Sequence, residues 1–168
     1  MIHVCSLADL PATVAATGAR HILTVMGDVT RVTRPEAVPE TNHLMIRMDD
    51  ITEPADGFVA PCVAHVEQAL AFVRRWDRAA PLVIHCYAGI SRSTASAFMA
   101  ACALNPHRDE TAIARQMRAA SPSAYPNRLI VDLADRALGR NGRMVRALDA
   151  MGPGNMTIES RPFRIEIE

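Results

Sequence analysis

The hydrophobic positions of this 168-residue chain form short apolar runs that alternate with longer segments of helical period. Four runs rich in β-branched and other apolar residues predict strands at 2–5, 21–25, 43–48 and 81–86. A helical segment over 7–18 separates the first two strands, and this β-α-β order requires that they pair in parallel. The fourth run is almost wholly apolar, which is typical of a parallel strand buried on both faces.

Helical patterns dominate the rest of the chain. Apolar residues recur at steps of three and four from 58 to 76, which indicates an amphipathic helix. Proline and glycine breakers bound four more predicted helices, over 91–104, 109–120, 126–139 and 143–151. Residues 27–42 are rich in proline, threonine and charge, and they are expected to form an exposed loop.

These elements predict one α/β domain over 1–168, with a mostly parallel central sheet of four to five strands flanked by helices. The tail alternates Phe163, Ile165 and Ile167 with charged residues, which is the pattern of a half-buried strand. Residues 153–168 could therefore add an edge strand to the sheet of their own chain or pair between subunits. The pattern leaves that choice, and the oligomeric state, open.

Composition narrows the function classes. The 18 arginines balance the 18 acidic residues, so neither nucleic acid nor an anionic membrane is expected to bind through the overall charge. No apolar run is long enough to cross a bilayer, and the first residues lack the features of a signal peptide. The four cysteines show neither metal-site spacing nor the density of a disulfide framework. We expect a cytoplasmic protein without a metal or other cofactor.

Three of the four cysteines and three of the histidines have no pattern that indicates a chemical role. Cys5, Cys62 and Cys102 fall on apolar strand or helix faces and are expected to be ordinary packing residues. The histidines without metal-like grouping are expected to lie on the surface or in packing positions; they are His43, His65 and His107.

One junction does carry a chemical signal. Residues 86–93, "CYAGISRS", leave a predicted strand and enter a predicted helix, so their backbone N–H groups and the helix N-terminus form an anion site. Gly89 allows the backbone to approach a ligand closely, and Arg92 offers a two-pronged donor to phosphate oxygens. The positive field favours the thiolate of Cys86, a nucleophile aimed at phosphorus, and Ser93 can donate a hydrogen bond to the sulfur.

Spacing alone is weak evidence for such a site in an arginine-rich chain. Arg92 lies six residues after Cys86, but Arg108 also lies six residues after Cys102. The second pair has Pro106 between its members, no glycine, and a cysteine inside a predicted helix. The strand before, the glycine within and the helix after therefore single out Cys86.

The segment "HCYAGISRS" resembles the phosphate-binding loop of the cysteine-dependent protein tyrosine phosphatases, and "AGISRS" is most similar to the dual-specificity subgroup, here identified as a bacterial member. The resemblance covers residues 1–139. It implies a nucleophilic Cys86, a phosphate clamp at Arg92, a thiolate partner at Ser93 and a scaffold role for His85. The implied phosphate-binding residues are Tyr87, Ala88, Gly89, Ile90, Ser91 and Arg92. "YPN" at 125–127 resembles the Pro-Asn segment of the family, which gives Asn127 a supporting role.

Cleavage of a phosphate ester also needs a proton for the leaving oxygen. In the family an aspartate on a loop after a strand supplies it, and "RMDDITEPADG" occupies that place. Asp49 and Asp50 are both candidates, since neighbours on an extended segment point in opposite directions; alignment with the family favours Asp50. Glu53 and Asp56 are lesser candidates, and Asp56 is expected to cap the helix before Phe58.

The resulting expectation is a phosphatase that acts on phosphotyrosine in a protein or peptide, with weaker activity on phosphoserine and phosphothreonine. Apart from Arg92 the loop is neutral, whereas a phosphoinositide would call for further cations, such as Arg31, Arg34 or Arg128. The alternatives are a phosphoinositide phosphatase, a rhodanese-like sulfurtransferase and a non-catalytic module that binds phosphoproteins.

Overall fold

The computed structural model describes residues 1–167. The strands are β1 (Ile2–Cys5), β2 (His21–Met26), β3 (His43–Arg47), β4 (Leu82–His85) and β5 (Phe163–Ile165). The helices are α1 (Leu10–Thr17), α2 (Val63–Arg75), α3 (Arg92–Leu104), α4 (Glu110–Ala120), α5 (Arg128–Ala137) and α6 (Arg143–Met151). Two short 3₁₀ turns, Val29–Arg31 and Glu40–Asn42, lie between β2 and β3.

The strands form one sheet in the order β3-β2-β4-β1-β5. The first four strands run parallel, and β5 pairs antiparallel with β1. The predicted α/β fold with a mostly parallel sheet is confirmed. The tail strand completes the sheet of its own chain: Phe163 and Ile165 are buried, while Arg164 between them is exposed. Glu168 lies outside the described residues.

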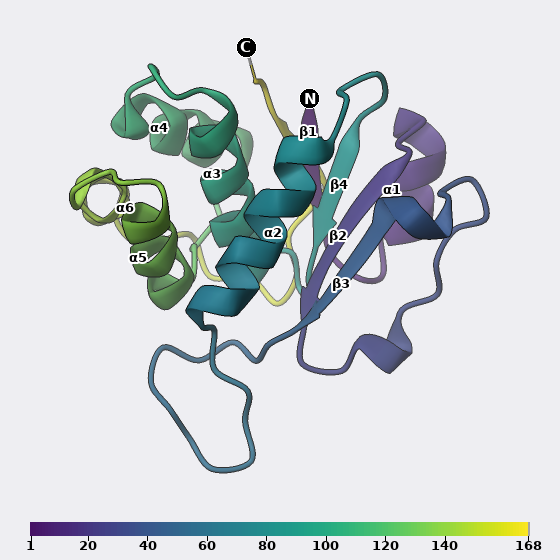
Figure 1. Ribbon diagram of the computed structural model, residues 1–168, viewed down its shortest axis with the longest axis horizontal. Helices are drawn as coiled ribbons and strands as arrows, with labels where there is room; N and C mark the ends of the chain where they lie inside the picture. The colour runs from purple at the N-terminus through teal and green to yellow at the C-terminus, as the bar shows by residue number, and fades with distance from the viewer. Residues whose placement is uncertain (168) are drawn as a thin grey trace.

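Helices cover both faces of the sheet (Figure 1). The single helix α1 lies on one face, where its apolar residues join a small core that includes Cys5, Ile22 and Val83. Helices α2 to α6 lie on the other face and build the larger core, in which Phe98 of α3 is almost completely buried. In parallel sheets of this kind ligands bind at the carboxyl ends of the strands.

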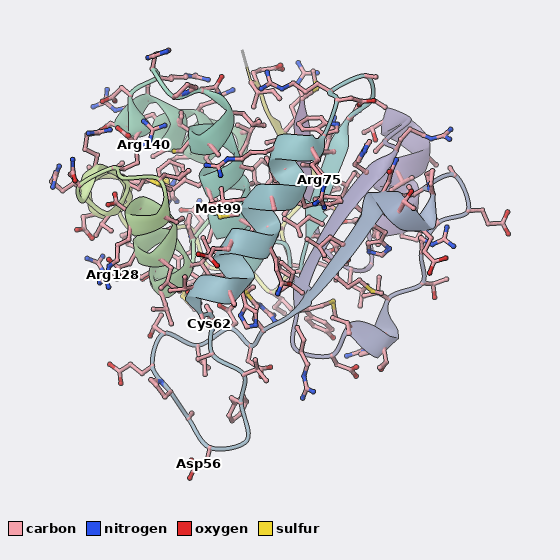
Figure 2. The ribbon with its side chains drawn as sticks, viewed as in Figure 1. Asp56, Cys62, Arg75, Met99, Arg128 and Arg140 are labelled. Atoms are coloured by element: carbon pink, nitrogen blue, oxygen red, sulfur yellow. The ribbon has the colours of Figure 1, made fainter. Side chains whose placement is uncertain are left out.

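Helix α2 begins later than its hydrophobic period suggests. It starts at Val63, because Val59 is held in a pairing with Asp49 and because a residue before proline, here the one before Pro61, avoids helical angles. The predicted cap at Asp56 is therefore wrong: the N-cap is Cys62, and Asp56 lies at the tip of a protruding loop (Figure 2).

Two smaller features also differ from the sequence pattern. Helix α1 begins at Leu10 rather than at residue 7, with Pro11 in its first turn, where a missing N–H costs nothing. The loop over 27–42 is largely exposed as expected, but Val38 is buried in the small core beside α1.

Among the described residues, no helix combines the length and apolarity that a bilayer crossing needs. The same residues bring no three His, Cys, Asp or Glu side chains together in a way that could hold a metal ion.

Candidate active site

The loop from Cys86 to Ser91, here called the cradle, connects the end of β4 to the start of α3. It presses against the end of β1. At Gly89 the backbone has φ of 74°, and a Cβ atom there would lie 2.9 Å from the carbonyl carbon of Cys5 and from the backbone nitrogen of Ser6. Only glycine satisfies both the angle and the space at this point, so the loop closes into a tight ring against β1.

The carbonyl groups of the cradle are held from outside by N–H groups of other segments. These bonds are Leu7 N–H to Tyr87 O (3.0 Å), Ser160 N–H to Ala88 O (2.9 Å), Tyr125 N–H to Ile90 O (2.9 Å) and Asn127 N–H to Ser91 O (3.3 Å). The hydroxyl of Thr94 donates to Ile90 O and to Ser91 O as well. Four separate parts of the chain thus fix the orientation of the loop backbone.

The tethered carbonyls also fix the direction of the N–H groups that belong to the same peptides. In a trans peptide the C=O and the N–H point in opposite directions, and the described chain has no cis peptide. Carbonyls that face outward therefore turn inward the next N–H groups, which belong to Ala88, Gly89, Ser91 and Arg92. Within residues 1–167, the N–H groups of Ala88 and Ser91 meet no protein acceptor, and that of Gly89 meets Sγ of Cys86. Together with the start of α3 they lie where the sequence predicts an anion site.

The sulfur of Cys86 lies at the base of this ring. Cys86 is 2% exposed; its Sγ lies 3.2 Å from Oγ of Ser93 and accepts a hydrogen bond from the N–H of Gly89 at 3.3 Å. Ser93 is completely buried and lies in the first turn of α3. Hydrogen bonds donated to sulfur stabilise its charged form. The contact predicted between Ser93 and the cysteine is present.

Arg92 reaches from the start of α3 toward the loop that carries the acidic candidates. Its Nη1 donates to the carbonyl of Met48 at 3.0 Å, and its Nε lies 3.9 Å from Oδ2 of Asp50. That Nε is buried and has no hydrogen-bond partner among the described residues. Buried donors are normally satisfied, so a donor of this kind at an anion site suits a phosphate oxygen.

The two adjacent aspartates have different surroundings. Oδ1 of Asp50 accepts hydrogen bonds from Oγ of Ser91 at 2.7 Å and from Nδ2 of Asn127 at 2.8 Å. Oδ1 of Asn127 in turn accepts the N–H of Ile130 and so caps α5. The carboxyl of Asp50 therefore lies beside Ser91, the last residue of the cradle.

Asp49 faces away and closes the base of its loop. Its N–H donates to the carbonyl of Val59, and its Oδ2 accepts the N–H of Val59, both at 2.7 Å. A Cβ at Gly27 would lie 2.0 Å from Oδ1 of Asp49, so the carboxyl packs directly on the end of β2. Asp49 is thus a structural clamp for the segment over 50–58, here called the acid loop.

A cleft of about 890 Å³ opens beside the cradle, and Ser91 and Asn127 belong to its wall. Tyr125 and Leu148 add apolar surface. The charged residues of the wall are Asp50, Glu53, Arg128 and Asp149, and Arg128 is bound to Asp149 in an ion pair. Asp56 is not part of this wall.

His85 is completely buried one residue before the nucleophile candidate. Its Nε2 lies 2.6 Å from the hydroxyl of Thr24, and its Nδ1 lies 3.4 Å from the carbonyl of Cys86. Burial, assisted by the charge of His43, lowers the pKa of His85 to about 4. The ring is therefore neutral at physiological pH.

The other cysteines are separate from the cradle. Burial raises the pKa of Cys5 and of Cys102 to about 12, so both remain thiols, as expected for packing residues. Cys5 joins the small core and Cys86 the larger one, on opposite faces of the sheet. Cys62 differs from expectation: it is exposed, because α2 begins only after it.

Sequence reasoning found the cradle but missed several of its supports. The clamp made by Asp49 and the tether from Ser160 have no local signal, since their partners are distant in sequence. Thr24 has a local signal, because it is the only polar residue of the run 22–26.

Comparison with known proteins gives structural matches alone. No family model and no curated protein sequence matches the chain. Among solved structures, DUSP15 superposes with a TM-score of 0.65 at 15% identity, covering 89% of each chain. The PTP-2 phosphatase of Cydia pomonella gives 0.63 at 17%, covering 80% of this chain and 84% of that one. Human DUSP28 gives 0.61 at 19%, covering 83% and 89%. The chain has the α/β fold of the dual-specificity-like protein tyrosine phosphatases.

Proposed function

We propose that this chain, built on the protein tyrosine phosphatase fold, hydrolyses phosphomonoesters through a cysteinyl-phosphate intermediate and prefers phosphotyrosine. The observation that carries the proposal is the cradle itself. A cysteine sulfur lies under a ring of inward-facing N–H groups, with Arg92 and Asp50 at the rim. This arrangement can bind a phosphate, attack it and protonate its leaving group.

In the first step the thiolate of Cys86 attacks phosphorus, so that an S–P bond forms and the P–O ester bond breaks. Asp50 gives its proton to the departing oxygen. Oδ1 of Asp50 is held by Ser91 and Asn127, which leaves Oδ2 as the oxygen available for the proton transfer.

In the second step water attacks the phosphorus of the cysteinyl-phosphate and Asp50 accepts a proton from the water. The S–P bond breaks, inorganic phosphate leaves, and the thiolate returns. Ser93 and the N–H of Gly89 stabilise the negative charge on the leaving sulfur, since both lie within hydrogen-bond distance of it. The inward N–H groups and Arg92 stabilise the charge that the phosphoryl oxygens carry throughout.

The side chains around the cradle favour an aromatic ester. Tyr87 and Tyr125 are both more than half exposed, and each is fixed to the cradle backbone or belongs to it. The guanidinium of Arg31 lies 5.2 Å from the centre of the Tyr87 ring, which helps to hold that ring in place. Two exposed aromatic rings beside a phosphate site can form the walls for a phosphotyrosine ring.

A head group with several phosphates finds less support. Arg128 is paired with Asp149, and Arg34 donates to the carbonyl of Val38. The cleft next to the cradle also presents the carboxylate of Glu53. This carboxylate would repel an additional phosphate, so a phosphoinositide is the weaker alternative. A sulfurtransferase would not need the proton donor Asp50, and a module that only binds phosphoproteins would not need the nucleophile Cys86.

Hydrolysis of an aryl phosphate with and without vanadate tests the activity itself. Side-by-side values of kcat/KM for matched phosphotyrosine and phosphothreonine peptides and for soluble phosphoinositides then test the specificity. We expect vanadate-sensitive hydrolysis with the phosphotyrosine peptide as the best substrate. A phosphoinositide preferred more than about tenfold, or about 1.4 kcal/mol of transition-state stabilisation, would reverse the substrate assignment. No hydrolysis of any of these esters would refute the activity.

A further inference from the structure

A row of three polar side chains crosses the buried sheet and ends beside the nucleophile candidate. The hydroxyl of Thr24 lies between two histidine rings, 2.8 Å from Nε2 of His43 and 2.6 Å from Nε2 of His85. Thr24 and His85 face each other on the paired strands β2 and β4, and both are completely buried. The row reaches the cradle where Nδ1 of His85 lies 3.4 Å from the carbonyl of Cys86.

The hydrogen atoms of this row can be assigned from chemistry alone. A carbonyl only accepts hydrogen bonds, so the contact with Cys86 O requires the hydrogen of His85 on Nδ1. A neutral imidazole has one N–H, and Nε2 of His85 must then accept the hydroxyl hydrogen of Thr24. The oxygen of Thr24 is left to accept the N–H of His43 at Nε2. The remaining nitrogen, Nδ1 of His43, carries only a lone pair.

The opposite assignment is worse at the His85 end of the row and no better at the His43 end. It would place the hydrogen of His43 on Nδ1, a buried atom without a hydrogen-bond partner among the described residues. It would also turn a bare Nδ1 of His85 toward the lone pairs of the Cys86 carbonyl. A buried donor without an acceptor and two lone pairs face to face are both unfavourable. Burial lowers the pKa of His43 to about 4, as it does for His85, so neither ring resolves the conflict by protonation near neutral pH.

We propose that Thr24 and His43 are positioning residues that fix His85 in its Nδ1–H tautomer, so that His85 holds the carbonyl of Cys86 and orients the first N–H of the cradle. The carbonyl of Cys86 and the N–H of Tyr87 belong to one trans peptide and point in opposite directions. A hydrogen bond that holds the carbonyl from the sheet side therefore directs the N–H of Tyr87 toward the phosphate site. His85 acts on this peptide as Leu7, Ser160, Tyr125 and Asn127 act on the peptides that follow.

The tautomer can be observed directly in the unmodified protein. Long-range ¹H–¹⁵N correlation spectra of the histidine rings, recorded at neutral pH, distinguish a protonated ring nitrogen from a bare one. We expect His85 to carry its hydrogen on Nδ1 and His43 on Nε2. Observation of His85 in the Nε2–H form overturns the proposal. This measurement does not depend on any enzymatic activity.

Variants of Thr24 test the consequence for catalysis, which rests on the proposed function. Thr24→Val keeps the shape but removes the hydroxyl, and Thr24→Ser keeps the hydroxyl. We expect Thr24→Val to lower kcat for an aryl phosphate about tenfold, or about 1.4 kcal/mol, and to abolish the uniform Nδ1–H signal of His85. Thr24→Ser should restore both. Unchanged kcat and an unchanged tautomer in folded Thr24→Val would refute the positioning role.

Two further variants, His43→Phe and the control Thr13→Val, complete the test. In His43→Phe the hydroxyl of Thr24 can still donate to His85 but loses the N–H that directs it, so we expect the Nδ1–H signal of His85 and kcat to fall less than in Thr24→Val. A larger loss in His43→Phe than in Thr24→Val would contradict the assigned direction of the row. Thr13→Val is the same substitution at another buried threonine, on α1, and it should leave the spectrum of His85 and kcat unchanged.

If Thr24→Val does not fold, the tautomers of the unmodified protein and the behaviour of Thr24→Ser still decide whether the positioning role holds. If no ester is hydrolysed, the proposed function fails while the tautomer measurement keeps its meaning.

Discussion

The cradle and the acid loop meet at the same site but are held in different ways. The cradle carbonyls named above are bound from several parts of the fold, and Gly89 is pressed against the end of β1. The acid loop projects from the body (Figure 1), and its residues 52–58 are all exposed. Its base is closed by the pairing of Asp49 with Val59, and Asp50 is bound by Ser91 and Asn127.

The difference corresponds to two chemical tasks. An anion site works best when its donors are oriented before the substrate arrives, because reorganisation then costs nothing during the reaction. A proton donor has to meet a leaving group that enters and departs at every turnover, so a segment fixed at its base and at Asp50 and Ile51, with its remaining residues exposed, is suitable. The predictions below change one region at a time and ask whether the other responds.

Replacement of the nucleophile should have the largest effect. Cys86→Ser should abolish turnover but keep the affinity for inorganic phosphate or tungstate, because the N–H groups and Arg92 remain. Steady-state kinetics and calorimetric titration measure the two quantities. Cys62→Ser, at the exposed cysteine, is the control and should be fully active; Cys102→Ser should retain kcat as well. Residual activity of more than a few per cent in Cys86→Ser would exclude this cysteine as nucleophile.

The two aspartates separate the proton donor from the clamp. Asp50→Asn should lower kcat by roughly 10²- to 10⁴-fold and flatten the alkaline limb of the pH–rate profile. The loss should be smaller for esters whose leaving group needs no proton, because only protonation has been removed.

Asp49→Ala provides the comparison. It opens the base of the acid loop but leaves Asp50 in the chain, so kcat should fall by about tenfold or less and the alkaline limb should persist. The reverse result, with the limb lost in Asp49→Ala or Asp49→Asn and kept in Asp50→Asn, would assign the acid to Asp49.

Acid should lower the free energy of unfolding. In the unfolded chain His43 and His85 take up a proton with a pKa near 6.5, whereas in the folded chain their pKa is lowered to about 4 by burial. Between these values the unfolded state binds more protons, so the free energy of unfolding is highest above pH 6.5 and falls as the pH drops toward 4. For the buried His85 the loss is on the order of 3 kcal/mol at most.

Urea unfolding at pH 7 and at pH 4.5 measures this loss. His43→Gln, which removes one of the two histidine rings of the row, should reduce the difference between the free energies at the two pH values. A free energy of unfolding that is unchanged from pH 7 to pH 4.5 would contradict the neutral buried row.

The smallest effect concerns the rim of the cradle. Arg31→Ala removes the cation over the ring of Tyr87, a contact worth about 0.5–1 kcal/mol at an exposed site. We expect KM for a phosphotyrosine peptide to rise about two- to fivefold with kcat unchanged. Arg74→Ala, on the exposed face of α2, is the control. An unchanged KM in Arg31→Ala would remove Tyr87 from the proposed substrate walls.

The sequence by itself determined the features that are encoded locally. Alternating apolar runs and helical periods were sufficient for the strands, the helices and the parallel sheet, because side-chain periodicity reflects which face is buried. The cradle was also readable, since its strand, glycine, arginine and helix follow one another within a few residues of Cys86. The hydrophobic period predicts a start of α2 near Phe58 with Asp56 as its cap, but the helix begins at Val63, because Asp49 binds the backbone of Val59.

The tertiary structure alone decided which groups from distant segments meet. Asp49 and Asp50 are neighbours of the same type in the sequence, and they differ only because Val59 faces one and Ser91 and Asn127 face the other. The tail strand joined its own sheet because β1 offered it a free edge, a fact that its alternating pattern could not contain. The row from Thr24 through His85 likewise exists only once β2 and β4 pair. Hydrogen-bond direction and burial are properties of the packed molecule, and they assign chemical roles that residue types leave open.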